Sequence, residues 1–210
     1  MLKLIYLARR RSGFTFDEFV RRWRRHGALG MQQTFWRHAL AYVQAEPVRL
    51  PAVADATAEF DAVACFITDD DMFTDMGEKD IAGSASMAAD ELETFSGPIA
   101  DVSLWVREER IQPGEPGGFT AFGFFADASA AREAATRAGA IGSFNRVTLN
   151  LRDDTALGPQ ANTLPYRAVV ELSASGSLQL AAALDQQEGQ LLADAQVRLI
   201  TREAVFWDRL

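Results

Sequence analysis

The feature that most restricts the fold is a short stretch in the middle of the 210-residue chain. Residues 112–118 (QPGEPGG) hold two prolines and three glycines in seven positions, so they can continue neither a helix nor a central strand. The segments on either side show the same order of apolar and amphipathic stretches. We therefore predict two halves, 1–111 and 119–210, joined by a linker at 112–118. Each half has the order β-α-β-β-α-β.

The expected elements follow from hydrophobic periodicity and turn residues. In the first half we expect strands at 2–8, 40–45, 60–67 and 102–109, a helix at about 16–27, and a helical stretch at 71–95 that breaks near Gly83-Ser84. In the second half we expect strands at 119–126, 146–151, 166–172 and 197–206, a helix at 129–138 ended by Gly139, and a helix at 178–192. The two halves share this pattern without sharing residue-level motifs.

Several of these strands are apolar on both faces. In the first strand, Leu2, Leu4 and Tyr6 share one face, and Ile5 and Leu7 share the other. Helices on one side of a sheet leave its second face to be buried elsewhere. The fold class we predict is α+β, with two ferredoxin-like (βαββαβ) halves whose antiparallel sheets pack face to face as a pseudo-dimeric α+β barrel. An aromatic-lined space between the sheets could hold a ligand.

The first helix is the best-marked element of the chain. Thr15 and Glu18 have the spacing of a capping box, and Phe14 and Phe19 have the spacing of a hydrophobic staple. An apolar stripe then recurs at helical intervals. Its members are Phe16, Phe19, Val20, Trp23 and Gly27.

This helix places a histidine at the border between its apolar stripe and its arginine-rich face. The chain has only two histidines, His26 and His38. An unperturbed histidine pKa of ~6.5 suits proton transfer near neutrality. A border histidine that only bonds a backbone carbonyl is the alternative, and spacing alone favours it.

Composition excludes several classes of partner. The net charge is −8 and the pI about 4.8, whereas a nucleic-acid-binding domain normally carries a basic patch. No stretch approaches the ~20 apolar residues of a membrane span, and the apolar N-terminal stretch is too short for a signal peptide. Cys65 is the only cysteine, which excludes an internal disulfide and a cysteine-based zinc site, and we expect it in the core. We expect a cytoplasmic protein that binds neither nucleic acid nor membrane.

Motifs for phosphate, dinucleotide or serine-hydrolase chemistry are missing. The two histidines lie twelve residues apart and form no metal-ligand pattern. The run Asp69-Asp70-Asp71 lacks the spacing of a calcium loop, and we expect it to end a strand and cap the next helix. Cofactor-free acid–base chemistry remains, and we expect neither a metal nor a cofactor.

Four segments together resemble the EthD family of the dimeric α+β barrel superfamily. They are Leu4–Leu7, Phe14–Phe19, the Trp-x-x-His of Trp23–His26, and Tyr42–Gln44. Two further stretches, Phe60–Ala64 and Ala89–Glu91 with Phe95, are also similar, although Asp61-Ala62 stands where Asp-Gly is commoner. The resemblance covers residues 1 to about 110, and the second half lacks Trp-x-x-His.

Members of that family usually pair two subunits to close the barrel. The resemblance therefore implies that this chain closes a pseudo-dimeric barrel alone, with a single active cavity in its first half. Two such chains could pair again as a homodimer.

The resemblance implies His26 as the general acid or base, at the mouth of a cavity between sheet and helix. Tyr42 and Asp61 complete the predicted catalytic set: Tyr42 would bond a carbonyl or enolate, and Asp61 would orient His26 or act as a second base. Tyr42 could instead simply pack at the rim, and Asp61 could bond the start of its own strand. The predicted substrate contacts are Tyr6, Trp23, Trp36, His38 and Phe66. Trp36 and His38 would form a lid over the pocket, or only a solvated turn.

Three functions remain open at this point. The leading one is a lyase-, isomerase- or cyclase-type enzyme in which His26 moves a proton on a small apolar, carbonyl-bearing substrate that is aromatic, polyketide-like or a lactone. The second is a non-catalytic module for ligand binding or assembly. The third is a haem-binding barrel that uses His26 or His38.

Overall fold

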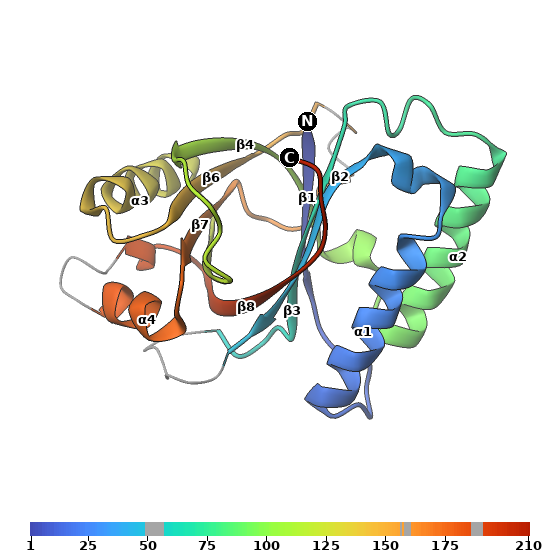
Figure 1. Ribbon diagram of the computed structural model, residues 1–210, viewed down its shortest axis with the longest axis horizontal. Helices are drawn as coiled ribbons and strands as arrows, with labels where there is room; N and C mark the ends of the chain where they lie inside the picture. The colour runs from blue at the N-terminus through green and yellow to red at the C-terminus, as the bar shows by residue number, and fades with distance from the viewer. Residues whose placement is uncertain (49–56, 156, 158–160, 186–190) are drawn as a thin grey trace.

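The computed structural model describes residues 1–48, 57–155, 157, 161–185 and 191–210 (Figure 1). Its strands are β1 (Leu2–Ala8), β2 (Ala39–Pro47), β3 (Ala62–Thr68), β4 (Ser103–Gln112), β5 (Phe119–Phe125), β6 (Arg146–Arg152), β7 (Ala168–Ala174) and β8 (Val197–Asp208). Its helices are α1 (Phe16–Gly30), α2 (Glu78–Thr94), α3 (Ala128–Ile141) and α4 (Ser177–Asp185), with 3-10 turns η1 (Thr34–His38) and η2 (Ile99–Val102).

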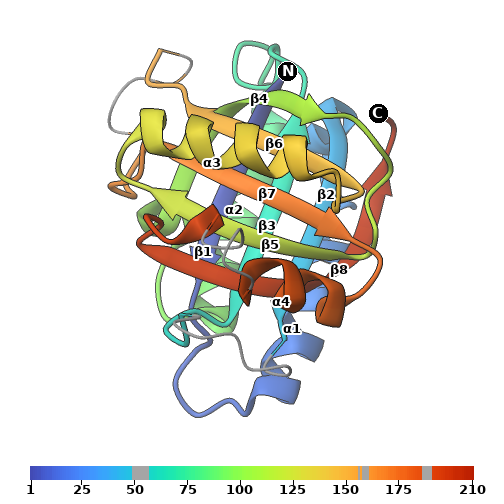
Figure 2. The same ribbon diagram turned by 90° about the vertical axis from the view of Figure 1, so that its left-hand side faces the viewer.

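The strands form a closed antiparallel barrel in the order β1-β3-β2-β8-β5-β7-β6-β4. The strands before the Pro/Gly segment are neighbours, as are those after it. The two sets join through the β2–β8 and β4–β6 pairs. Helices α1 and α2 lie outside one side of the barrel, and α3 and α4 lie outside the opposite side (Figure 1). The view turned by 90° looks onto α3 and α4 (Figure 2). The described residues thus form a mixed α/β fold on an eight-stranded antiparallel barrel.

Burial of both strand faces explains the apolar pattern of β1. Ile5 and Leu7 face the barrel lumen, where they pack in one cluster with residues of β5 and β8 such as Phe122 and Leu199. Tyr6 and Ala8 face outward and pack beneath α1 and α2. A third cluster fills the space between the other side of the barrel and α3 and α4. The free, buried Cys65 belongs to the lumen cluster, as expected of a small core residue.

One end of the lumen is polar rather than apolar. Lys3 Nζ lies 2.6 Å from Glu171 Oε1 on β7 and 3.0 Å from Glu108 Oε2 on β4. Asn150 Nδ2 donates to the same Glu171 oxygen at 2.9 Å. Burial opposes the charge on Lys3, but the nearby carboxylates outweigh it and raise the pKa of the ammonium. The β1 side of the barrel is therefore tied to the β7 side through its interior.

Glycine misled the prediction of two helix boundaries. Helix α2 runs unbroken through Gly83. A Cβ there would lie 2.9 Å from Gln33 Oε1, so the missing side chain lets the helix lie close to the start of η1. Helix α3 continues past Gly139 to Ile141, and its C-cap is Gly142, whose φ of +69° suits a residue without a side chain.

The acidic run 69–71 does not cap α2, because that helix begins at Glu78. The carboxylate of Asp80 there accepts the Gly77 N–H at 2.9 Å. Strand β7 begins at Ala168, two residues later than predicted. The predicted helix 178–192 appears as α4, and residues 186–190 of it lie outside the described residues. In the part of the chain that the structure describes, no helix is both long and apolar enough to cross a membrane.

The Lys3 contacts lead to a stability prediction. Replacing Lys3 with methionine keeps the stem but leaves the buried Glu171 carboxylate without its cation, whereas the partly exposed Glu108 keeps its contact with Arg110. Such a loss typically destabilises by about 3–5 kcal/mol. We expect a fall of that order in the free energy of unfolding, measured by urea denaturation at neutral pH. Arg132→Met is the control, because its pair with Glu109 is exposed, and it should change stability little. Equal stability of the Lys3→Met variant and the parent would show that the lumen contacts contribute nothing net.

Candidate functional site

Helix α1 begins as its sequence predicts. Thr15 Oγ1 accepts the Glu18 N–H at 3.3 Å, and the Glu18 carboxylate accepts the Thr15 N–H at 2.8 Å. Phe19 and Trp23 are completely buried beneath the helix. The helix runs one turn beyond the predicted end, to Gly30.

Gly27 sets how closely α1 approaches the sheet. A Cβ at this position would lie 2.7 Å from Gln44 Nε2 and 2.9 Å from Tyr42 Cε1, both on β2. The missing side chain lets the helix backbone lie directly against these two residues. The turn that carries His26 is thereby held beside Tyr42.

A cavity of about 240 Å³ opens between α1, α2 and the outer face of the barrel. Its walls are mainly aromatic and aliphatic, with His26, Ser84, Glu91 and two tyrosines as the polar groups. The lining residues are Leu4, Tyr6, His26, Gly27, Gly30, Phe35, Trp36, Tyr42, Phe66, Met72, Phe73, Ser84, Met87, Glu91, Ile99 and Trp105. The cavity thus lies between sheet and helix, where His26 was expected, whereas the expected space between the sheets is occupied by packed side chains.

A carboxylate on α2 orients the His26 ring. His26 Nδ1 lies 2.7 Å from Asp90 Oδ2, and Arg22 Nη1 donates to the same oxygen at 3.0 Å. Burial opposes the charge on Asp90, but the bonds from Arg22 and His26 outweigh it, so the pKa of Asp90 is lowered. An ionised carboxylate only accepts, so Nδ1 carries the ring proton and Nε2 carries the lone pair.

The His26 ring is neutral at pH 7. Burial lowers its pKa below 6.5, and the Asp90 bond only partly offsets this. The ring packs edge-on against Phe95, with centroids 5.3 Å apart. Its Nε2 forms no hydrogen bond with any residue that the structure describes. His26 therefore presents a basic nitrogen on a cavity-lining side chain.

Glu91 is a second titratable group on the cavity wall. Burial raises its pKa, an effect that its bond from the Ile99 N–H, at 3.0 Å, partly offsets. Asp90 and Glu91 belong to a stretch that carries the family resemblance, but the sequence predicts a role for neither. Their pairing across to α1 depends on how two helices pack, and no local signal marks it.

Tyr6 and Tyr42 lie side by side in the cavity wall. Their hydroxyl oxygens are 3.3 Å apart. Trp23 Nε1 donates to Tyr6 Oη at 3.0 Å, and Gln44 Nε2 donates to Tyr42 Oη at 2.8 Å. Burial raises the pKa of both phenols, so both are protonated near neutrality. Trp23 thus lies behind the wall as a partner of Tyr6, and it does not line the cavity.

Asp61 lies away from the cavity, at the start of β3. Its carboxylate accepts the backbone N–H of Arg10 at 3.0 Å. The expectation that Asp61 orients His26 is therefore wrong, because Asp90 occupies that position. Asp61 does not bond the start of its own strand either, since its backbone partner Arg10 lies just beyond the end of β1.

Trp36 and His38 belong to η1, and neither is part of a solvated turn, since both are less than 9% exposed. Trp36 and the predicted contact Phe66 both line the cavity, with ring centroids 5.3 Å apart. The indole N–H of Trp36 is buried and has no acceptor among the described residues. His38 does not line the cavity.

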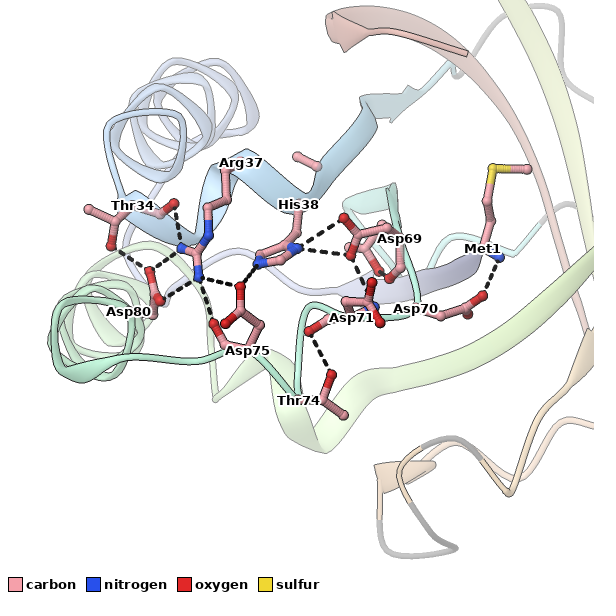
Figure 3. A network of polar contacts seen from close by, with 12 residues as sticks. Met1, Thr34, Arg37, His38, Asp69, Asp70, Asp71, Thr74, Asp75 and Asp80 are labelled. Carbon is pink, nitrogen blue, oxygen red and sulfur yellow. Dashed lines mark hydrogen bonds and ion pairs between the residues drawn. The ribbon is translucent and has the colours of Figure 1, made fainter.

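His38 instead joins two segments that form cavity walls (Figure 3). Its Nδ1 lies 2.9 Å from both carboxylate oxygens of Asp69, and its Nε2 lies 3.8 Å from Asp75 Oδ2. The neighbouring Arg37 donates to both oxygens of Asp80, at 2.8 and 2.9 Å. The Asp69 and Asp75 contacts hold η1 against the turn that follows β3, which carries Met72 and Phe73, and the Asp80 contact holds η1 against α2.

The arrangement does not suit a metal or haem. The described residues contain no cluster of three or more His, Cys, Asp or Glu able to hold a metal ion. The cavity is smaller than the ~300–1,000 Å³ typical of sites for drug-sized ligands, and a haem macrocycle is a large ligand on that scale. His38, the other candidate haem ligand, lies between two carboxylates outside the cavity.

No protein-family model and no curated protein matches the sequence. Solved structures do match the fold over nearly the whole chain. A candidate chlorite dismutase shares 9% identity at a TM-score of 0.54, with 97% of this chain and 94% of that chain covered. A candidate monooxygenase from Fusobacterium nucleatum shares 9% identity at a TM-score of 0.53, with 97% and 91% covered. An anthrone oxidase-like protein shares 11% identity at a TM-score of 0.51, with 100% and 94% covered.

These neighbours belong to the dimeric α+β barrel superfamily. At such low identity the likeness shows that this chain has their fold, and it shows nothing of their chemistry. The resemblance to the EthD family itself stays a prediction.

The His26–Asp90 contact predicts a titration. In a His38→Gln background, the ¹H–¹³C NMR signal of His26 should titrate with a pKa below 6.5. Asp90→Asn removes an interaction that favours the imidazolium, so in that variant the pKa should fall further. A rise in pKa on this substitution would contradict the assigned arrangement.

Proposed function

We propose that this chain is a cofactor-free enzyme in which His26 moves a proton on a small apolar substrate that carries a carbonyl group. The reaction is of lyase, isomerase or cyclase type. The observation that carries the proposal is a neutral histidine on a cavity wall, with one nitrogen fixed by a carboxylate and the other unbonded.

Asp90 contributes orientation and not proton uptake. By holding Nδ1–H, it fixes the tautomer in which Nε2 can accept a proton, and it stabilises the imidazolium that forms. Arg22 balances the charge of Asp90, so the carboxylate remains ionised in a partly buried position. The three side chains form a base whose strength and direction are both set by the packing of α1 on α2.

The side chains of the cavity wall favour an apolar, planar substrate. Phe35, Phe66, Phe73 and Trp105 present ring surfaces, and Met72 and Met87 add adaptable thioether chains. A carbonyl next to the reacting carbon acidifies the proton to be removed, and the resulting enolate requires a hydrogen-bond donor, which the Tyr6–Tyr42 pair supplies. An aromatic ketone, a polyketide-like compound or a lactone has these properties.

The catalytic roles we propose are proton transfer for His26 and hydrogen bonding to the substrate for Tyr42 and Tyr6. Trp36 and Phe66 contact the substrate. We also propose that the barrel consists of two ferredoxin-like halves, in keeping with the β-α-β-β-α-β element order on either side of the Pro/Gly segment. The single site then belongs to the first half, and the second half completes the barrel.

The proposal predicts the outcome of a proton-exchange experiment. 1-Indanone is a bicyclic aromatic ketone whose protons next to the carbonyl exchange in D₂O, and ¹H NMR follows that exchange. His26→Gln should lower the protein-catalysed exchange rate by about 10²–10⁴-fold, the usual contribution of a positioned general base.

Asp61→Asn is the matched control, since it removes a carboxylate away from the cavity and should leave the exchange rate unchanged. Thermal unfolding of each variant verifies that it is folded. Equal exchange rates in the parent and in a folded His26→Gln variant would remove the proposed mechanism and favour a module that only binds a ligand.

A further inference from the structure

The hydrogen bonds around Tyr6 and Tyr42 can be counted proton by proton. Arg24 Nη1 donates to Gln44 Oε1 at 2.8 Å, and a guanidinium cannot accept, so the orientation of the Gln44 amide is fixed. Both hydrogens of Gln44 Nε2 are then donated, one to Trp23 O at 3.0 Å and one to Tyr42 Oη at 2.8 Å. Tyr42 Oη is therefore an acceptor in this bond.

The same reasoning applies to Tyr6. The Trp23 indole nitrogen is only a donor, so at 3.0 Å it gives its hydrogen to Tyr6 Oη. Each phenol oxygen has accepted one bond, and each still carries its own proton. The contact of 3.3 Å between the two oxygens accommodates only one of these protons.

One hydroxyl proton is therefore left without an acceptor. No residue that the structure describes accepts it, although both tyrosines are about 95% buried and both line the cavity. Burial raises the pKa of both phenols, so ionisation does not remove the extra proton near neutrality. Buried donors in proteins nearly always have a partner.

We propose that the missing acceptor is an oxygen of the ligand, so that the Tyr6–Tyr42 pair selects molecules with a carbonyl or enolate oxygen. This inference rests on the proposed function and specifies how its substrate is recognised. An ammonium group offers only donors and would leave the hydroxyl unbonded. A hydrocarbon of the same shape would do the same.

The pair also suits the reaction. When His26 removes a proton next to a carbonyl, negative charge develops on the carbonyl oxygen, and a bond from a neutral hydroxyl strengthens as it does. Either tyrosine can provide the extra proton, because reversing the bond between them exchanges donor and acceptor. The donor function is thus shared, and losing one hydroxyl leaves the other with its proton free.

This sharing predicts a non-additive pattern of binding. The probes are 1-indanone and indane, which differ by one carbonyl oxygen, and quenching of intrinsic tryptophan fluorescence measures their Kd. The parent should bind 1-indanone about tenfold more tightly than indane, as expected of one hydrogen bond in a buried site. Tyr6→Phe and Tyr42→Phe should each keep most of this preference, whereas the double variant should lose it, with a ratio near one.

Three outcomes would overturn the inference. They are no preference in the parent, loss of the preference in either single variant, and a preference that survives in the double variant. A purely structural role would weaken both probes equally in each variant, which leaves the ratio unchanged. Thermal unfolding and far-UV circular dichroism verify that each variant is folded, and the ratio in the parent tests the inference without any substitution.

The binding ratio is independent of catalysis. His26→Gln should retain the tenfold preference for 1-indanone even though its exchange rate falls. Loss of exchange with an intact preference would support both proposals. An intact preference with unchanged exchange would overturn only the role of His26, and a ratio of one with normal His26-dependent exchange would overturn only the role of the tyrosines.

Discussion

The structure depends on one constraint, which is that the strands of the first half are apolar on both faces. One face is buried against the other strands of the barrel, with Ile5 and Leu7 in the lumen. The opposite face is buried beneath α1 and α2, with Tyr6 and Ala8 in that layer. A sheet buried on both faces borders two separate layers of packed side chains, one in the lumen and one beneath the helices. The candidate site lies in the layer beneath the helices.

The two layers differ in what they can hold. The lumen is packed with aliphatic and aromatic side chains, and Lys3 links opposite strands across its polar end. These contacts hold the barrel closed. The outer layer contains large rings that do not completely fill the space between the barrel wall and the two helices. Gly27 lets α1 touch β2, and Phe35 and Met72 line the cavity that remains beside this contact. The cavity is a consequence of packing unlike shapes.

Local signals allowed the first helix and most strands to be predicted, because their causes lie within a few residues. The Thr15–Glu18 capping box set the start of α1, and alternation of side chains set β1. Glycines were misread, because Gly83 permits a close contact with Gln33, a residue fifty positions away. The His26 partner was misassigned for the same reason. Asp90 is 64 residues from His26 in the sequence, and only the packing of α1 on α2 brings them together.

The electrostatics of His26 show why that partner matters. A carboxylate at 2.7 Å would by itself raise the pKa of a histidine, so that Nε2 would be protonated near neutrality. Burial disfavours the imidazolium, and the charge of Arg22 on the same carboxylate adds to this effect, so the pKa falls instead. Orientation and basicity are thereby separated: Asp90 fixes the direction of the ring, while Arg22 and the apolar surroundings keep Nε2 unprotonated. A histidine bonded to a backbone carbonyl would have the orientation, but it would lack the nearby charge that stabilises the imidazolium once a proton has been taken up.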